Sequence, residues 1–475
     1  METKTAGIII IGDEILKGQT QKNLRELGVR VNRISVIPDD LSSISAEVRQ
    51  FSSQFDFVLT SGGIGPTHDD ITFEGVGNAF DDKLIFNPDL VDKCKIWFKK
   101  DDLSDPCFKL AYIPSTSKLN YGFDYNTGKP TLYPLVSVNN VYIFPGIPQL
   151  LERSFRNLGS TLFKVNFKFI AGESFIHQDE LSLTNSINKL VSEFPETSFG
   201  SYPSLVNQFY KTRISYECPS EVQLNQISEY IRTRMPVVEF DKVPHENSRE
   251  KINELMSRTE DTVFKKNLEQ ALDIVEECFN RYNSEEVSVC YNGGKDCIVM
   301  LHLVHAVHQS KHPEKRLNSL YIREQNTFQE VDTFITESIL KYKLENKTIS
   351  HPMKAALKQL LEEDKDVKAT VLGTRDGDPG AQYQDAFSPT DGDWPRIMRV
   401  NPILKWRYQD VWTFLRGLSI PYPSLYDQGY TSLGNPENTQ PNPALRFSDE
   451  KGLVRYHPAY LLEDGSLERQ GRTKK

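Results

Sequence analysis

The sequence predicts an α/β protein of two modules. Short apolar runs typical of buried parallel strands alternate with segments of helical spacing, first over residues 6–60 and again over residues 262–372. A polar stretch, Pro236–Ser257, separates the two alternations and is expected to be a linker. We therefore expect an N-terminal α/β domain with a small α+β subdomain, followed by a C-terminal α/β domain. The expected boundaries are 1–160, 161–240, 241–260 for the linker and 261–475.

The first module is expected to contain a largely parallel sheet with helices on its faces. Ala6–Ile11 is a continuous apolar run, which is typical of a strand buried on both faces. Asn139–Asn140 lies between two further apolar runs and is expected to form a tight hairpin. Strands are expected at 6–11, 29–37, 55–60, 135–138 and 141–144, helices at 44–55 and 149–158, and in the subdomain strands at 164–170 and 208–216 with helices at 179–194 and 221–235.

The second module repeats the alternation of strands and helices. Strands are expected at 287–291, 319–323 and 369–372, and helices at 262–282, 296–309, 328–342 and 353–361. A long loop, 376–394, follows the last of these strands. Loops of that length are uncommon in compact domains and are usually functional or disordered.

Composition excludes several classes of protein. The net charge of −9 gives no sign of the basic face that nucleic-acid-binding proteins present. No apolar run approaches the 18 residues of a membrane-spanning helix, and no secretory or transit segment is recognisable. The six cysteines include no CxxC pair, which argues against a disulfide framework and a zinc site. We expect a cytoplasmic protein that binds neither nucleic acid nor membranes.

The strand expected at 287–291 runs directly into Asn292-Gly293-Gly294-Lys295-Asp296, and a helix begins at once. The two glycines let the backbone approach a ligand closely, and the amides and dipole of a helix N-terminus favour an anion. Lys295 adds a positive charge. The loop is neither a Walker A loop nor a dinucleotide fingerprint. The alternative to phosphate binding is a tight turn in which Asp296 caps the helix.

Asn292–Cys297 resembles the pyrophosphate loop of the adenine-nucleotide α-hydrolase group, which cleaves ATP between the α and β phosphates and includes the phosphoadenylyl-sulfate (PAPS) reductases. Later segments narrow the resemblance to the eukaryotic FAD synthase family. These segments are Gly373-Thr374-Arg375, Asp378-Pro379, Phe387–Asp391, Trp394-Pro395, Met398–Pro402, Trp412–Leu415, Tyr430–Gly434 and Asn442–Leu445. The family transfers AMP from ATP to FMN, giving FAD and pyrophosphate. The resemblance therefore implies ATP and FMN as substrates and Mg²⁺ as the ion that bridges the phosphates.

The resemblance also implies a role for each matching residue. The ATP site would comprise Asn292, Gly293, Gly294, Lys295, Asp296, Gly373, Thr374 and Arg375, and the FMN site Asp378, Asp391, Trp394 and Arg399. Asn292, Lys295, Asp296 and Asp378 are the expected catalytic residues, and Asp296 is also the expected Mg²⁺ ligand. Arg399 would pair with the FMN phosphate, and Trp394 would lie against the isoalloxazine ring. Asp378 and Asp391 could instead form turns, Trp394 could pack a loop, and Arg375 could pair with one of these aspartates.

His302, His305 and His308 recur at helical spacing after the phosphate loop. Their spacing resembles a set of metal ligands. No carboxylate completes such a site in the sequence nearby, so we expect them to form one polar face of a helix.

Three segments of the first module resemble the molybdopterin-binding fold over residues 5–160. They are Gly12–Gly18, Ser61–Thr72 and Phe144–Pro148. The implied site comprises Gly12, Asp13, Glu14, Gly62, Gly63, Gly65, Thr67, Asp69 and Asp70. Its glycines suit a phosphate, and its paired aspartates suit a metal, so hydrolysis of FAD or a similar diphosphate is one hypothesis. A degenerate domain with a regulatory or purely structural role is the other, because residues 19–27 are about two helical turns shorter than in the family and lack its Asp.

Two other functions stay open at this point. An ATP-dependent sulfur-transfer protein or reductase would share the phosphate loop, but the sequence has no cysteine after Cys297 to carry the sulfur chemistry. A non-catalytic regulatory protein would bind a flavin or a pterin without turnover. The number of motifs in order favours the FAD synthase interpretation. The sequence predicts neither the oligomeric state nor the coupling between the modules.

Overall fold

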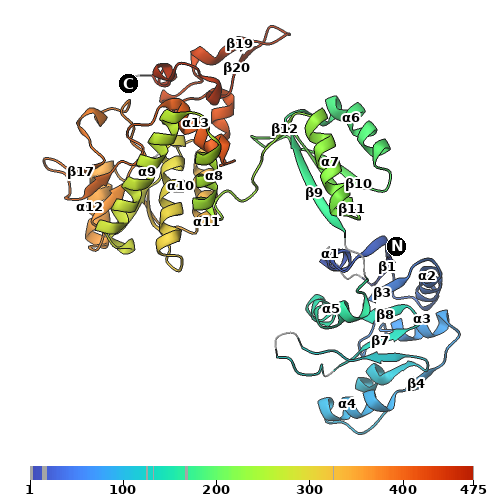
Figure 1. The fold of residues 1–475 in the computed structure, drawn as a ribbon. Helices are drawn as coiled ribbons and strands as arrows, with labels where there is room; N and C mark the ends of the chain where they lie inside the picture. Colours follow the sequence, from blue (N-terminus) through green and yellow to red (C-terminus); the bar gives the residue numbers. More distant parts are fainter. Residues whose placement is uncertain are drawn as a thin grey trace. The chain divides into compact units, whose positions relative to one another are not determined.

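The computed structural model describes residues 4–12, 19–124, 127–131, 133–165, 169–324 and 326–473. The chain divides into two compact units, which are described separately (Figure 1). The first comprises Met1–Glu173, Ser186–Gly200 and Ser215–Thr233, and the second comprises Ser174–Asn185, Ser201–Ile214 and Arg234–Lys475. Within the described residues, no helix is long and apolar enough to cross a membrane.

A six-stranded sheet forms the centre of the first unit, in the order β2-β1-β3-β8-β7-β6. The strands are β1 (Lys4–Ile11), β2 (Val29–Ile37), β3 (Phe57–Ser61), β6 (Lys118–Asn120), β7 (Leu135–Val138) and β8 (Val141–Phe144). Strands β2, β1, β3 and β8 run parallel, whereas β7 pairs antiparallel with β8 and β6 pairs antiparallel with β7. In the sheet, β2 is the neighbour of β1 on one side and β3 is its neighbour on the other. The carboxyl ends of β1 and β3 therefore flank the crevice where such sheets bind ligands.

The side chains of β1 alternate between two apolar cores, one on each face of the sheet. Ile9 and Ile11 pack with residues of α2 (Leu41–Gln54) and α3 (Thr72–Ala79). Ile8 and Ile10 pack with residues of α1 (Gln19–Glu26) and α5 (Pro148–Leu162). The prediction of a strand buried on both faces is confirmed. The expectations did not include α3, α4 (Pro88–Phe98) or the small hairpin of β4 (Leu84–Phe86) and β5 (Tyr112–Pro114).

A four-stranded sheet follows, in the order β10-β11-β9-β12. Its elements are β9 (Ile170–Ile176), α6 (Glu180–Glu193), β10 (Ser198–Pro203), β11 (Thr212–Cys218), α7 (Glu221–Arg234) and β12 (Val237–Val238). The strand expected at 164–170 is misplaced, since β9 begins at Ile170, while residues 166–168 lie outside the described part. In the structure Gly172 lies inside the strand, where a Cβ would collide with the Tyr216 ring.

The prediction of a linker at Pro236–Ser257 is wrong for the second half of that stretch. Residues Ser248–Arg258 form a helix, α8, whose Ile252 and Leu255 are buried in the core of the second unit. Few apolar side chains of α8 pack in that core, namely the buried Ile252 and Leu255 and the partly buried Met256, so the polar composition of the segment hides the helix. The segment is therefore part of the packed C-terminal unit rather than an extended connection.

A second six-stranded sheet forms the centre of the C-terminal unit, in the order β15-β14-β13-β16-β18-β17. All neighbouring strands pair in parallel except β17 with β18. The strands are β13 (Val287–Cys290), β14 (Asn318–Ile322), β15 (Glu345–Ile349), β16 (Ala369–Val371), β17 (Phe387–Pro389) and β18 (Met398–Val400). The expected long loop thus contains a short edge strand, β17. The chain crosses from β13 toward β15 and returns to β16, which places a topological switch point between β13 and β16.

The helices of this unit are α9 (Thr262–Arg281), α10 (Lys295–Lys311), α11 (Gln329–Lys341), α12 (Met353–Glu363) and α13 (Tyr408–Gly417). Helix α10 lies between α8 and α9 in Figure 1 and also contacts α13. Because α10 is enclosed by other helices and by the sheet, its side chains from Ile298 to His308 are buried.

The expectation that three histidines form a polar face of this helix is wrong. His302, His305 and His308 are 0%, 3% and 2% exposed. Each ring has one polar partner, respectively the hydroxyls of Tyr342, Ser248 and Ser284. In the described residues, no group of three or more histidine, cysteine or carboxylate side chains could hold a metal ion. The histidines are core residues paired with hydroxyl groups.

Candidate active site

The phosphate loop connects β13 to α10 in the conformation that its glycines permit. Gly293 has a φ of +71°, and a Cβ at this position would lie 2.8 Å from Cγ1 of Ile335. The Gly294 amide donates a hydrogen bond to the Asn292 side-chain oxygen over 3.0 Å. The Lys295 amide donates to the Tyr426 hydroxyl over 2.9 Å. The loop is therefore held by its own Asn292 and by the buried Tyr426, whose hydroxyl bonds to the first residue of α10.

A second loop, which follows β16, packs directly on the start of α10. A Cβ at Gly373 would lie 2.8 Å from the backbone nitrogen of Cys297, so only glycine fits there. Because β13 and β16 are neighbours in the sheet, their carboxyl ends bring Asn292 and Gly373-Thr374 to the same edge. The two sequence motifs meet at the switch point, where a nucleotide site is expected in folds of this type.

A cavity of about 460 Å³ opens beside these two loops. It is lined by Cys290, Asn292, Cys297, Ile322, Met353, Leu357, Thr370, Leu372, Gly373, Thr374, Asp378, Pro379, Gln384, Thr390, Asp391, Trp394 and Arg399. All four residues expected to contact FMN are present, together with three of the eight expected to contact ATP. One cavity thus joins residues from the phosphate loop with residues near 378–399. Such a concave site with a few convergent polar groups is typical of cofactor and nucleotide pockets.

The three charged residues of the ATP prediction do not line this cavity and form part of a ring of four alternating charges. Lys295 Nζ lies 2.9 Å from Oδ2 of Asp296, and Arg375 Nε lies 2.6 Å from Oδ1 of the same carboxylate. Glu468 closes this charge ring, because its two carboxylate oxygens bond to Lys295 and to Arg375. Burial alone would raise the pKa of Asp296, but the two adjacent cations outweigh it and hold this pKa below its usual value. The four side chains therefore carry two positive and two negative charges.

Glu468 was missed by the sequence reasoning. It lies 173 positions from Lys295, and no local pattern marks it as part of the site. Lys295 is 1% exposed and contacts carboxylates in the structure, so its expected contact with ATP stays a prediction. Arg375 pairs with Asp296 and Glu468 through its guanidinium, whereas its backbone amide donates to Asp378 over 3.0 Å.

The residues expected at the FMN end lie on exposed loops and on the sheet edge. The Arg399 guanidinium donates to the Pro389 carbonyl over 3.0 Å and lies 3.4 Å from the Asp391 carboxylate. Trp394 is 37% exposed and lines the cavity. Asp378 accepts a bond from the Arg375 amide, which fits its alternative as a turn former, and it also lines the cavity. The flavin roles of these residues stay predictions.

The first unit has its own glycine-rich crevice between the ends of β1 and β3. Gly12, Gly62 and Gly63 have φ values of +85°, +106° and +62°, so each adopts a conformation that favours glycine. The carboxylate of Asp39, which was not among the expected residues, lies beside Gly12 and Gly63. The expected residues Asp13 and Glu14 lie outside the described part of the chain.

The paired aspartates of this crevice form a turn. Asp70 accepts hydrogen bonds from the Thr67 amide, over 2.8 Å, and from the Thr67 hydroxyl. Asp69 is exposed, and a hydrogen bond with Thr67 lowers its pKa. Gly65 lies against Asp70, which leaves little room for a side chain there. The metal-binding role expected for Asp69 and Asp70 stays a prediction.

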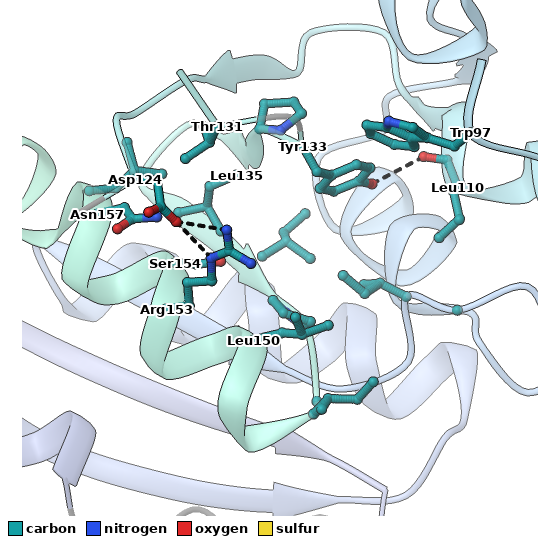
Figure 2. A pocket seen from close by; sticks show the side chains of 18 of the residues that line it. Trp97, Leu110, Asp124, Thr131, Tyr133, Leu135, Leu150, Arg153, Ser154 and Asn157 are labelled. Carbon is teal, nitrogen blue, oxygen red and sulfur yellow. Dashed lines mark hydrogen bonds and ion pairs between the residues drawn. The ribbon is translucent and has the colours of Figure 1, made fainter. Parts of the chain in front are cut away.

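A cavity of about 780 Å³ adjoins this turn and includes Gly63, Gly65 and Asp70 in its wall (Figure 2). Figure 2 shows Trp97 and Tyr133 on one side of it and the pair Asp124–Arg153 on the other. Arg153 Nη2 lies 2.7 Å from Oδ2 of Asp124, and the Tyr133 hydroxyl donates to the Leu110 carbonyl over 3.3 Å. The cavity therefore offers aromatic surfaces and a charged pair next to a glycine-rich loop.

These features define a protein of two α/β domains, each with a glycine-rich loop at a switch point of its sheet. Family models agree with that class. Residues 286–441 match the phosphoadenosine phosphosulfate reductase domain, residues 7–164 match a probable molybdopterin binding domain, and residues 168–243 match the middle domain of FAD synthase.

The chain belongs to the FAD synthase family. It is 34% identical over 507 residues to a probable FAD synthase of Caenorhabditis briggsae, which covers 99% of this chain and 97% of the relative. It is 35% identical over 506 residues to a probable FAD synthase of Caenorhabditis elegans, with coverages of 99% and 98%. Among solved structures, an FMN adenylyltransferase of Candida glabrata is 26% identical, covering 49% of this chain and 97% of its own, with a TM-score of 0.46. The expected family is confirmed.

Proposed function

We propose that the chain is an FMN adenylyltransferase, which transfers AMP from ATP to FMN to give FAD and pyrophosphate. The observation that carries this proposal is the single cavity at the β13/β16 switch point. It joins Asn292 of the phosphate loop with Asp391, Trp394 and Arg399 of the expected flavin site. Membership of the FAD synthase family supports the same activity.

The arrangement suits an in-line displacement without a covalent intermediate. An oxygen of the FMN phosphate attacks the α-phosphorus of ATP, and the bond from that phosphorus to the pyrophosphate oxygen breaks. Catalysis of such transfers depends mainly on positioning and charge stabilisation. The start of α10 supplies backbone amides and a positive dipole for phosphate groups. Arg399 would hold the FMN phosphate, and Trp394 would contact the flavin ring.

We propose Mg²⁺ as the metal that accompanies ATP. Proteins usually bind this ion through one or two carboxylates, several waters and the substrate phosphates. The absence of a three-ligand group among the described residues is compatible with that mode. Asp296 is the expected protein ligand, although both of its oxygens contact cations in the structure and one of these contacts would have to be exchanged. The ion would neutralise phosphate charge.

The test is an assay of the full chain with FMN, ATP and Mg²⁺, in which FAD and pyrophosphate are followed together. Equal appearance of both products supports adenylyl transfer. Binding of FMN and ATP with neither product would instead support the non-catalytic alternative. The same assay with Mg²⁺ replaced by a chelator tests the metal. The cytoplasmic location stays a prediction from the sequence.

The cavity of about 780 Å³ in the first unit favours a second candidate function, which is binding or hydrolysis of a diphosphate such as FAD. Helix α1 spans only eight residues, consistent with the shortened segment noted in the sequence. FAD breakdown by the full chain is the measurement, with Asp69→Ala/Asp70→Ala as the control. Turnover that does not exceed this control would leave binding as the function of the cavity.

A further inference from the structure

Two motif segments, Tyr430–Gly434 and Asn442–Leu445, contribute no residue to the wall of the nucleotide cavity within the described chain. Their side chains instead hold a later stretch of the chain. The Thr431 hydroxyl donates to the Glu468 carbonyl over 2.6 Å, and the Asn442 side-chain amide donates to the Leu467 carbonyl over 2.9 Å. The same amide also bonds to the Thr431 hydroxyl. Thr431 and Asn442 are buried, so these bonds are shielded from water.

The residues that follow are held in the same way. The Gln440 amide donates to the Gly471 carbonyl over 2.9 Å, and the Thr473 amide donates to the Asn438 carbonyl over 3.0 Å. We call residues 465–473 the C-terminal segment. Because its backbone is bonded before and after Glu468, the position of that residue is set by the fold and not only by its charged partners.

The carboxylate of Glu468 reaches the charge ring from this fixed backbone. Its two oxygens bond to Lys295 and Arg375, the same two cations that contact Asp296. The side chains of Lys295, Arg375 and Glu468 are 2%, 8% and 14% exposed. Removal of one carboxylate from such a group leaves a surplus buried positive charge, which drives the remaining side chains to other partners.

Lys295 and Asp296 belong to the phosphate loop and the start of α10, and Arg375 follows Gly373-Thr374 on the neighbouring loop. We propose that Glu468 is a positioning residue for adenylyl transfer. Its carboxylate holds Lys295 and Arg375 on Asp296 and thereby fixes where their positive charge lies relative to the phosphate loop. The inference rests on the proposed function. Charges fixed before the reaction stabilise the charge that develops in the transition state better than mobile ones do.

Glu468→Gln in the full chain removes the charge and keeps the size of the side chain. We expect kcat for FAD formation to fall by roughly tenfold to a hundredfold, as for other residues that orient catalytic groups. The KM values for FMN and for ATP should each change by less than about threefold. Glu468→Asp, which keeps the charge on a shorter side chain, should retain more kcat than Glu468→Gln but less than the unaltered chain. Circular dichroism and thermal melting report whether each variant folds.

Glu463→Gln is the matched control, because this exposed glutamate lies just before the C-terminal segment and outside the charge ring. A folded Glu468→Gln variant with kcat within twofold of the control would overturn the proposal. Equal kcat values for Glu468→Asp and Glu468→Ala would also overturn it, since the carboxylate would then not be the group that matters. If Glu468→Gln does not fold, an unchanged kcat in Glu468→Asp overturns it. Failure of the unaltered chain to form FAD would count against the proposed function instead.

Discussion

At the scale of single residues, Asp296 carries a partly buried charge that two cations hold. Its carboxylate accepts bonds from Lys295 and Arg375, and these cations hold its pKa below the usual value. We expect Asp296→Ala to lower kcat for FAD formation by at least about a hundredfold, the scale seen when a charge-stabilising group is lost. The loss of a partner for two buried cations should also cost about 1–3 kcal/mol of stability. Near-normal FAD production by a variant with normal circular dichroism would contradict the assignment.

Arg399 lies at the other end of the same cavity. Among the described residues its guanidinium bonds to the carbonyl oxygens of Ser388 and Pro389 and to the exposed Asp391 carboxylate, so a phosphate can compete for it. We expect Arg399→Ala to raise the KM for FMN by roughly tenfold or more, the loss of one charge-assisted contact, with less than a threefold change for ATP. Steady-state kinetics with each substrate varied in turn measure both constants. An unchanged KM for FMN would rule out the phosphate pairing.

At the scale of elements, α10 links the site to the acid stability of the C-terminal unit. Burial, together with the nearby charges of His245 and Lys343 for His305 and of His312 and Lys315 for His308, lowers the pKa of each of these two histidines to about 4. An unfolded chain would bind these protons near pH 6.5. Stability is therefore complete above about pH 6.5 and is lost as the pH falls toward 4, by up to about 1.4 kcal/mol for each unit of pKa difference.

Thermal melting at pH 7.5, 6.0 and 5.0 tests this expectation. His305→Gln cannot charge, so its melting temperature should fall less between pH 7.5 and 5.0 than that of the unaltered chain. Carboxylates with lowered pKa values also lose stabilising bonds in acid, but at lower pH, and they are the same in both proteins. An equal fall in melting temperature between pH 7.5 and 5.0 in the two proteins would show that protonation of His305 does not cause the loss of stability in acid.

The elements also show what the sequence could predict. Strand β1 was predicted because its burial on both faces appears as a continuous apolar run. The phosphate loop and the residues near 378–399 were predicted from contiguous motifs, and the sheet brings them together. Glu468 and Asp39 could not be predicted, because each joins its site through contacts distant in sequence. Helix α8 was missed because most of its residues are polar and few of its apolar side chains, such as Ile252 and Leu255, enter the core.

At the scale of the whole molecule, α8 determines which fragment of the chain contains the complete core of the C-terminal unit. Ile252 and Leu255 are 0% and 5% exposed, and they pack in the same core as α9 and α10. A fragment of residues 259–475 would lose both side chains and leave their cavities open, whereas a fragment of residues 240–475 keeps them. Truncation of one buried leucine or isoleucine typically costs about 2–5 kcal/mol.

We expect the shorter fragment to unfold at a clearly lower urea concentration and to lose FAD synthesis at temperatures where the longer one is active. The double variant Ile252→Ala/Leu255→Ala in the longer fragment should reproduce most of that loss. Equal urea midpoints for the two fragments would mean that α8 is dispensable and that residues 241–260 behave as the linker that the sequence predicted.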